Sequence, residues 1–164
     1  MTKGLLIRKF KQDDLSSLRS LILDADNFGK PFLEPELLNL KRDSIPEFGC
    51  VYVAVLGDTI VGYITLRKNI FALAVDSIIV QKEHQRKGIG TALIEQAKTY
   101  AMSEGFKVLR ADTGNFMDHA IKFYLACGFK PCGYVENDWG LNTRQLHFYM
   151  DLSEQQGRTL GQKT

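Results

Sequence analysis

Two glycines, Gly88 and Gly90, stand two residues apart behind the cations Arg86 and Lys87, in the stretch HQRKGIGTA (residues 84–92). This stretch follows the apolar run FALAVDSIIV, so we expect a strand to end and a helix to begin here. The N-terminus of a helix presents backbone N–H groups without partners in the helix, and the positive end of the helix dipole. A glycine-rich turn lets a pyrophosphate group approach that end closely, and the two cations add charge. The spacing therefore indicates a site for a ligand that carries phosphate groups.

Two familiar nucleotide-binding patterns do not fit this turn. The dinucleotide fingerprint GxGxxG needs a third glycine where Leu93 stands, and no repeated βαβ units surround it. The nucleoside-triphosphate loop ends in Gly-Lys-Ser/Thr, whereas Lys87 precedes Gly88 here. A tight strand-to-helix turn without a ligand would explain a lone GxG equally well. The residues on either side of the turn must therefore decide.

Those residues resemble the GNAT (GCN5-related N-acetyltransferase) superfamily. In VQKEHQRKGIGTALI, Gln85, Gly88 and Gly90 match the acetyl-CoA-binding pattern Q/R-x-x-G-x-G/A of that family. The downstream stretch GNFMDHAIKFYLACGF is similar to its second conserved block. The matching residues of that block are Asn115, Ala120, Phe123, Tyr124, Gly128 and Phe129. The resemblance extends over residues 4–152 and is most informative over 73–130.

The resemblance implies a single-domain α/β (α+β) acyl-CoA N-acyltransferase fold, with a mixed sheet of about six to seven strands flanked by about four helices. It also implies an acetyl-CoA-dependent N-acetyltransferase. The residues then expected at the CoA pyrophosphate are Gln85, Arg86, Lys87, Gly88, Ile89, Gly90 and Thr91. The resemblance further implies that the strand at Ile78, Ile79 and Val80 splays from the strand KVLRADT and offers backbone groups to the pantetheine arm.

Three more residues are candidates for contact with the substrates. Asn115 is in position to contact pantetheine, and it can equally cap the helix that follows; the two roles can coexist. Tyr124 matches the usual acid of the family, which protonates the CoA thiolate, although its place on an apolar helical stripe also fits a core aromatic residue. Asp76 interrupts an apolar strand, where a lone carboxylate would be suited to accept a proton. A solvent-facing aspartate is the alternative.

No single motif defines the acceptor. The family carries specificity in the first two helices and the last hairpin, where acidic residues can form an entrance for a cationic amine and aromatic residues can pack against its carbon chain. The acidic residues here are Asp26, Glu34, Glu36, Glu136 and Asp138, and the aromatic ones are Phe28, Phe32 and Trp139. Solvated loop charges are the alternative. We expect direct attack by the primary amine of a small molecule, with protein or peptide acetylation, or a CoA-binding regulatory module without turnover, as alternatives.

Composition limits other functions. The chain has 164 residues, a formal net charge of +2 and 45% hydrophobic residues, which is typical of a soluble globular protein. We expect no nucleic-acid partner, because there is no strong basic excess, and no membrane span, because no apolar run approaches about 18 residues. The three cysteines and three histidines lack metal-ligand spacing, so no metal is expected. A cytoplasmic location is expected, and a homodimer only by analogy with relatives.

Periodicity and turn signals predict the elements that position these residues. Strands are expected at 4–10, 50–56, 59–68, 71–80, 107–113, 131–136 and 144–152, with a hairpin at Gly57-Asp58. Helices are expected at 13–25, from about Pro35, at 88–104 and at 115–126. Residues 1–152 are expected to form one domain, and residues 153–164 a disordered tail.

Overall fold

The computed structural model describes residues 4–25, 29–138, 140 and 142–153, and these contain seven strands and four α-helices in the order that the sequence predicts. The strands are β1 (Leu5–Lys9), β2 (Gly49–Leu56), β3 (Thr59–Lys68), β4 (Leu73–Val80), β5 (Val108–Gly114), β6 (Lys130–Glu136) and β7 (Arg144–Asp151). The α-helices are α1 (Leu15–Leu23), α2 (Gly29–Asp43), α3 (Ile89–Ser103) and α4 (Asp118–Ala126). Two short 3-10 turns are η1 (Gln12–Asp14) and η2 (Lys82–His84). The tail predicted to be disordered lies, beyond Ser153, outside the described residues.

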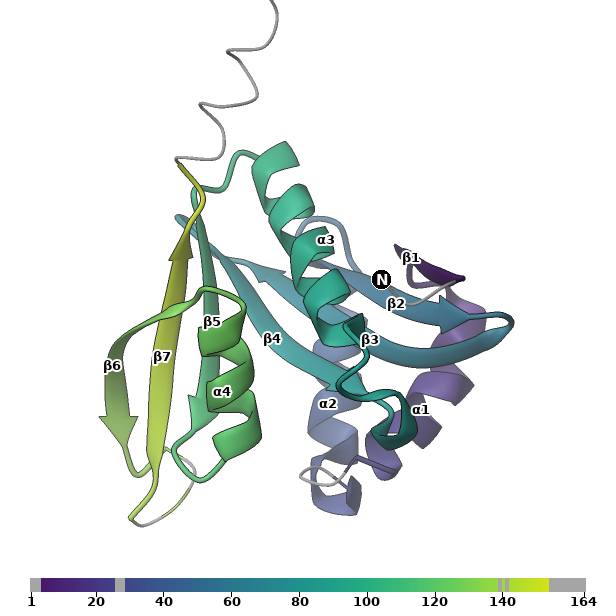
Figure 1. Cartoon of the computed structure of the whole chain (residues 1–164), viewed down its shortest axis with the longest axis horizontal. Coiled ribbons are helices and arrows are strands. Elements are labelled where there is room, and N and C mark those ends of the chain that lie inside the picture. Colours follow the sequence, from purple (N-terminus) through teal and green to yellow (C-terminus); the bar gives the residue numbers. More distant parts are fainter. Residues whose placement is uncertain (1–3, 26–28, 139, 141, 154–164) are drawn as a thin grey trace, which may run out of the picture. The chain divides into compact units, whose positions relative to one another are not determined.

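The strands form a mixed sheet with the order β1-β2-β3-β4-β5-β7-β6 (Figure 1). The pairs β1–β2, β2–β3, β5–β7 and β6–β7 are antiparallel, and β4 pairs with β5 in parallel, from Leu73 opposite Leu109 to Val75 opposite Ala111. The predicted fold class is therefore confirmed. By their contacts, the described residues divide into two compact units: those within 1–68 and 76–97, and those within 69–75 and 98–164.

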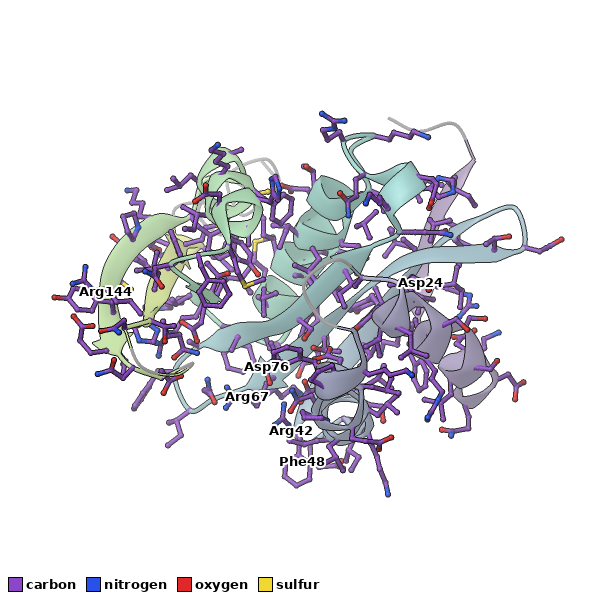
Figure 2. All side chains as sticks on the ribbon, turned by 90° about the horizontal axis from the view of Figure 1, so that it is seen from below. Asp24, Arg42, Phe48, Arg67, Asp76 and Arg144 are labelled. Atoms are coloured by element: carbon purple, nitrogen blue, oxygen red, sulfur yellow. The ribbon has the colours of Figure 1, made fainter. Side chains whose placement is uncertain are left out.

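In the first unit, α1 and α2 cover one face of the sheet. Helical spacing aligns Leu18, Leu21 and Ile22 on the inner side of α1, where they meet apolar residues of α2 and of the strands. The remaining members of this core are Leu33, Leu40, Val53, Val55, Tyr63 and Ile79. Burying one such large side chain contributes about 1.5–3 kcal/mol, so this layer fixes both helices on the sheet. The beginning of α3 lies on the other face of the sheet (Figures 1 and 2).

Helix α2 begins at Gly29 and continues through Pro35, whereas the sequence predicted that it would begin near Pro35. That prediction was wrong for a physical reason. A proline lacks the N–H that would bond to the carbonyl four residues earlier, yet Leu33, Glu36 and Leu40 are all buried at helical spacing. Burial of this face on the sheet outweighs the loss of one hydrogen bond in an exposed part of the helix.

The second unit is built on β5, β7 and β6, with α4 packed against β5 and β7 (Figure 1). Residues alternate along these strands: Leu109, Ala111 and Phe148 are buried, while Asp112 and His147 point to the opposite face. Strand β6 is the edge of the sheet, and all its residues are exposed. Helix α4 and the strand β5 before it therefore fix the position of Tyr124.

No helix within the described ranges is long and apolar enough to cross a membrane.

Candidate active site

The predicted phosphate-binding turn lies between η2 and α3, in the first unit. Gly88 has a φ of 83° and Arg86 a φ of 57°, left-handed values that favour glycine. Ala92 N–H donates to Gly88 O over 2.9 Å, so α3 begins directly after the turn. The first amides of the helix, which have no acceptor within it, belong to Ile89, Gly90 and Thr91. Arg86, Lys87 and Gly88 are exposed beside them.

The side chain of Gln85 holds the turn against the end of β4. Its Nε2 donates to Val80 O over 3.0 Å, and Gln81 N–H donates to Val61 O of β3 over 2.8 Å. Ile79, between Ile78 and Val80, is buried in the core with α1 and α2. Because the amide of Gln85 is used in this way, the backbone amides are the groups that the turn offers to a ligand.

These residues fit the phosphate groups of acetyl-CoA. A Cβ built on Gly88 would meet no atom within 4 Å, so the space in front of the turn is open. The glycine is therefore required by its backbone conformation and not by crowding from the rest of the protein. Arg86 and Lys87 are exposed beside that space, and their charge and the N-terminus of α3 have the sign that phosphate requires.

Asp76, the predicted base, lies between two guanidinium groups. Arg67 Nε on β3 donates to both of its carboxylate oxygens, over 3.0 and 2.9 Å, and Arg42 Nη2 on α2 donates to Oδ2 (Figure 2). Arg42 Nε also donates to Asp43 Oδ1 over 2.7 Å. The carboxylate is therefore not isolated, and the sequence-based reason for choosing it as a base does not hold. Its role in catalysis stays a prediction.

A buried hydrogen bond between Glu36 and Tyr63 lies in the same unit. Tyr63 Oη donates to Glu36 Oε1 over 2.8 Å, and both side chains are almost completely buried. Burial raises the pKa of Glu36, against the hydrogen bonds from Ser77 and Tyr63, and the charges of Asp76 and Asp43 raise it further. Burial and the neighbouring Glu36 also raise the pKa of Tyr63. The side chain of Glu36 therefore lies buried between α2 and β3, and it does not form part of a solvated acidic entrance.

Tyr124, the predicted acid, is 4% exposed on α4 in the second unit. Its ring packs edge-on against Phe129, with 5.3 Å between centroids, and at a tilt of 35° against Phe148 of β7, with 5.9 Å between centroids. Burial raises the pKa of its hydroxyl well above the ordinary value, and the charges of Asp112 and Cys127 raise it further. Tyr124 is therefore a core aromatic residue whose phenol is protonated at neutral pH, the form that an acid requires.

Asn115 fastens the turn before α4 to β7 and does not cap the helix. Its Oδ1 accepts a hydrogen bond from Arg144 N–H over 2.9 Å, and its own N–H donates to Arg144 O over 2.8 Å. The N-cap of α4 is Met117, without a side-chain hydrogen bond. The expected capping role was therefore wrong, because the side-chain oxygen of Asn115 accepts the hydrogen bond from Arg144 of β7 instead. Contact with pantetheine stays a prediction.

Sequence reasoning missed the pair formed by Asp112 and His147. These residues are opposite each other in the register of β5 and β7, and His147 Nδ1 lies 2.5 Å from Asp112 Oδ1. The histidine was considered only as a metal ligand, and an aspartate 35 positions away gave no signal before the strands were paired. An alternating pattern on both strands could have placed the two residues on one face, but not in register.

The residues expected at an acceptor entrance are dispersed. Glu34 is exposed and pairs with Arg19 at 3.9 Å, and Glu136 pairs with Arg144 at 3.0 Å. Phe32 and Asp138 are exposed, whereas Asp26, Phe28 and Trp139 lie outside the described residues. The described parts of the chain hold no group of three or more His, Cys, Asp or Glu residues that could bind a metal. None of the three cysteines, all of them in the described parts of the chain, forms a disulfide: Cys50 is buried, Cys127 half-buried and Cys132 exposed.

Comparison with known proteins places the chain in a family. Residues 15–129 match the model of the Acetyltransferase (GNAT) family. An uncharacterized N-acetyltransferase, YvbK, of Bacillus subtilis is 32% identical over 122 residues, which cover 72% of this chain and 76% of the relative. Streptothricin acetyltransferase of Escherichia coli is 33% identical over 91 residues, 55% of this chain and 52% of that protein. The chain spans about half the length of some curated relatives it matches; for one human N-acetyltransferase the match covers 46% of that protein.

A solved structure agrees with this. An acetyltransferase structure from Bacillus anthracis, in complex with acetyl coenzyme A, is 25% identical, with a TM-score of 0.75, and the match covers 90% of this chain and 98% of that one. The chain belongs to the GNAT family of acetyltransferases. That family comprises acetyl-CoA-dependent N-acetyltransferases, so the class of enzyme and the acyl donor expected from the sequence are confirmed.

Proposed function

We propose that this chain transfers the acetyl group of acetyl-CoA to the primary amine of a small molecule, by direct attack of the amine. The observation that carries the proposal is the turn at Gly88, whose left-handed backbone and exposed cations precede the N-terminus of α3. Acetyl-CoA, when bound, supplies an activated acetyl thioester. Gln85 to Thr91 would hold its phosphates through backbone amides and the charges of Arg86 and Lys87. Ile78, Ile79 and Val80 would offer their backbone to the pantetheine arm.

Tyr124 is the proposed general acid. Its raised pKa keeps a proton on the phenol at neutral pH, and that proton is available to the departing sulfur. Burial also excludes water from around the hydroxyl, which strengthens hydrogen bonding there. We retain Asp76 as the base expected from the sequence, although its two arginine partners support a structural role equally well.

A small-molecule acceptor is favoured by one relative, the streptothricin acetyltransferase of E. coli, whose name gives a small-molecule substrate. We propose the same class of acceptor, an amine that is cationic in solution, for this chain. Acetylation of a protein or peptide is the alternative. A cytoplasmic location, the lack of a nucleic-acid partner and a homodimer also remain proposals; sedimentation velocity would test the last.

The experiment is release of CoA thiol from acetyl-CoA across a panel of small amines, aminoglycosides and short peptides, with Tyr124→Phe beside the wild type. We expect release that depends on one class of amine and falls about 10²–10⁴-fold in kcat for the variant, with the Kd for acetyl-CoA unchanged. Tyr134→Phe on the exposed strand β6 is the control, since it removes the hydroxyl of a tyrosine that is 55% exposed. Binding of acetyl-CoA without release for any amine would favour a regulatory module, and release only with peptides would favour a protein substrate.

A further inference from the structure

Asp112 and His147 form a carboxylate–imidazole pair on the paired strands β5 and β7. Asp112 Oδ1 and His147 Nδ1 are 2.5 Å apart, and their side chains are 33% and 19% exposed. Because a carboxylate accepts a hydrogen bond, the pair assigns the proton to Nδ1 and leaves Nε2 as a proton acceptor. The His147 side chain is 19% exposed, so part of the imidazole is open to solvent. An imidazole oriented in this way by a carboxylate is the arrangement of a general base.

The pair is linked to Tyr124 within the second unit. The charge of Asp112 is one of the causes that raise the pKa of Tyr124, so the two groups are electrostatically coupled. Tyr124 packs on Phe148, the residue after His147, and successive residues of a strand point to opposite faces. The proposed acid and the imidazole therefore lie on opposite faces of the same two strands.

We propose that His147, in place of Asp76, is the general base for the acceptor amine, with Asp112 as its positioning residue; this rests on the rest of the proposed function. His147 Nε2 takes a proton from the ammonium form of the acceptor, which frees the nitrogen lone pair. The N–C bond to the acetyl carbon forms, the C–S bond breaks, and the sulfur takes the proton of Tyr124. The nitrogen then loses a second proton, which passes through solvent to the Tyr124 phenolate. The proton held by His147 Nε2 is released to water. One acetyl-CoA and one ammonium thus give an amide, CoA thiol and one proton.

The other titratable and charged residues of the second unit that lie near the Asp112–His147 pair occupy neighbouring positions on β5, β6 and β7. Arg110 and Tyr149 are the next pair on the same face of β5 and β7, and Lys130 of β6 is opposite Tyr149. Gly133 of β6, beside Cys132, is opposite His147 and places no charge on it. Six groups of this unit can therefore influence how activity varies with pH. They are Asp112 and Arg110 of β5, Lys130 and Cys132 of β6, Tyr149 of β7 and Tyr124 of α4. Asp112 is the group among them that is hydrogen-bonded to the imidazole.

The test compares His147→Asn with His119→Asn, the latter an exposed histidine on α4 of the same unit. Asparagine retains a donor toward Asp112 but has no titratable nitrogen. We expect His147→Asn to lower kcat/KM about 10²–10⁴-fold, to abolish the fall of kcat/KM on the acid side of the pH profile, and to leave the Kd for acetyl-CoA within twofold. His119→Asn should match the wild type. Asp112→Asn should lower kcat/KM by a smaller factor, because the imidazole remains and only its orientation is lost.

A second measurement uses the protein without acetyl-CoA. The ¹⁵N shifts of the His147 ring at pH 8 should show Nδ1 protonated and Nε2 unprotonated; the opposite tautomer overturns the proposal, whether or not His147→Asn folds. If the wild type is active and His147→Asn retains kcat/KM within twofold, this inference alone is wrong. If the wild type acetylates no amine, the proposed function is wrong, and this inference falls with it. Thermal unfolding of each variant shows whether a loss of activity reflects a loss of fold.

Discussion

Arg67 and Asp76 face each other from β3 and β4, with Arg67 Nε 3.0 Å from one carboxylate oxygen and 2.9 Å from the other. Arg42 completes the contact from α2, so a helix and two strands meet at one carboxylate (Figure 2). A residue chosen from the sequence as a base is thus also the point where α2 is fastened to the sheet. These two roles predict different effects of substitution.

Asp76→Asn should lower the free energy of unfolding by about 1–2 kcal/mol, because two guanidinium groups lose their anionic partner. Both arginine side chains are 39% exposed, and water replaces part of the lost interaction. Urea denaturation measures the change. Glu34→Gln, which breaks the exposed contact with Arg19, is the control and should cost less than about 0.5 kcal/mol. Lost turnover at unchanged stability would instead support Asp76 as the base.

Gly88→Ala should weaken binding of acetyl-CoA severalfold. A Cβ at a φ of 83° costs about 1–2 kcal/mol, which shifts the turn away from the conformation that presents its amides. Gly4→Ala is a matched control, since Gly4 has a φ of 81° and, like Gly88, open space in front of it. Both variants should lose similar stability, and only Gly88→Ala should lose affinity, as isothermal titration would show. Equal affinities would exclude the turn as the phosphate site.

Glu36→Gln should become more stable relative to the wild type as the pH rises. Burial raises the pKa of Glu36 in the folded protein above its ordinary value of 4.5. Folding therefore favours the protonated form: this contribution to stability is complete below pH 4.5 and declines as the pH rises through the folded-state pKa. Glutamine is neutral at every pH and can still accept the hydrogen bond from Tyr63. Urea midpoints of both proteins at pH 4.5 and 7 test this, and a difference that does not change with pH would contradict it.

The sequence was sufficient for the elements because most of their signals are local. Alternation at 4–10 and runs of β-branched, aromatic and apolar residues farther along defined the strands, and the glycines at 57, 88 and 105 marked turns where a positive φ is required. The extent of α2 could not be predicted in this way. Its first two turns depend on burial of Leu33 against the core, a tertiary effect that overrides the local signal of Pro35.

The same distinction between local signals and contacts of distant residues applies to the candidate site. The turn residues and Tyr124 are contiguous motifs and could be recognised, whereas the partners of Asp76 come from positions 42 and 67 and those of His147 from position 112. Such pairs depend on register between elements far apart in the chain. Asn115 illustrates the same limit, since its local pattern indicated a helix cap and the structure instead joins it to Arg144.

The exposed thiol of Cys132 on the edge strand β6 affects how turnover can be read. Reagents that colour with free CoA also react with accessible protein thiols, and this cysteine would consume one equivalent per chain before any catalysis. Buried Cys50 would not compete in the folded protein. A Cys132→Ser background would therefore remove this contribution to the baseline, and in the unsubstituted protein the same thiol would accept a fluorescent label beside the strand that carries His147.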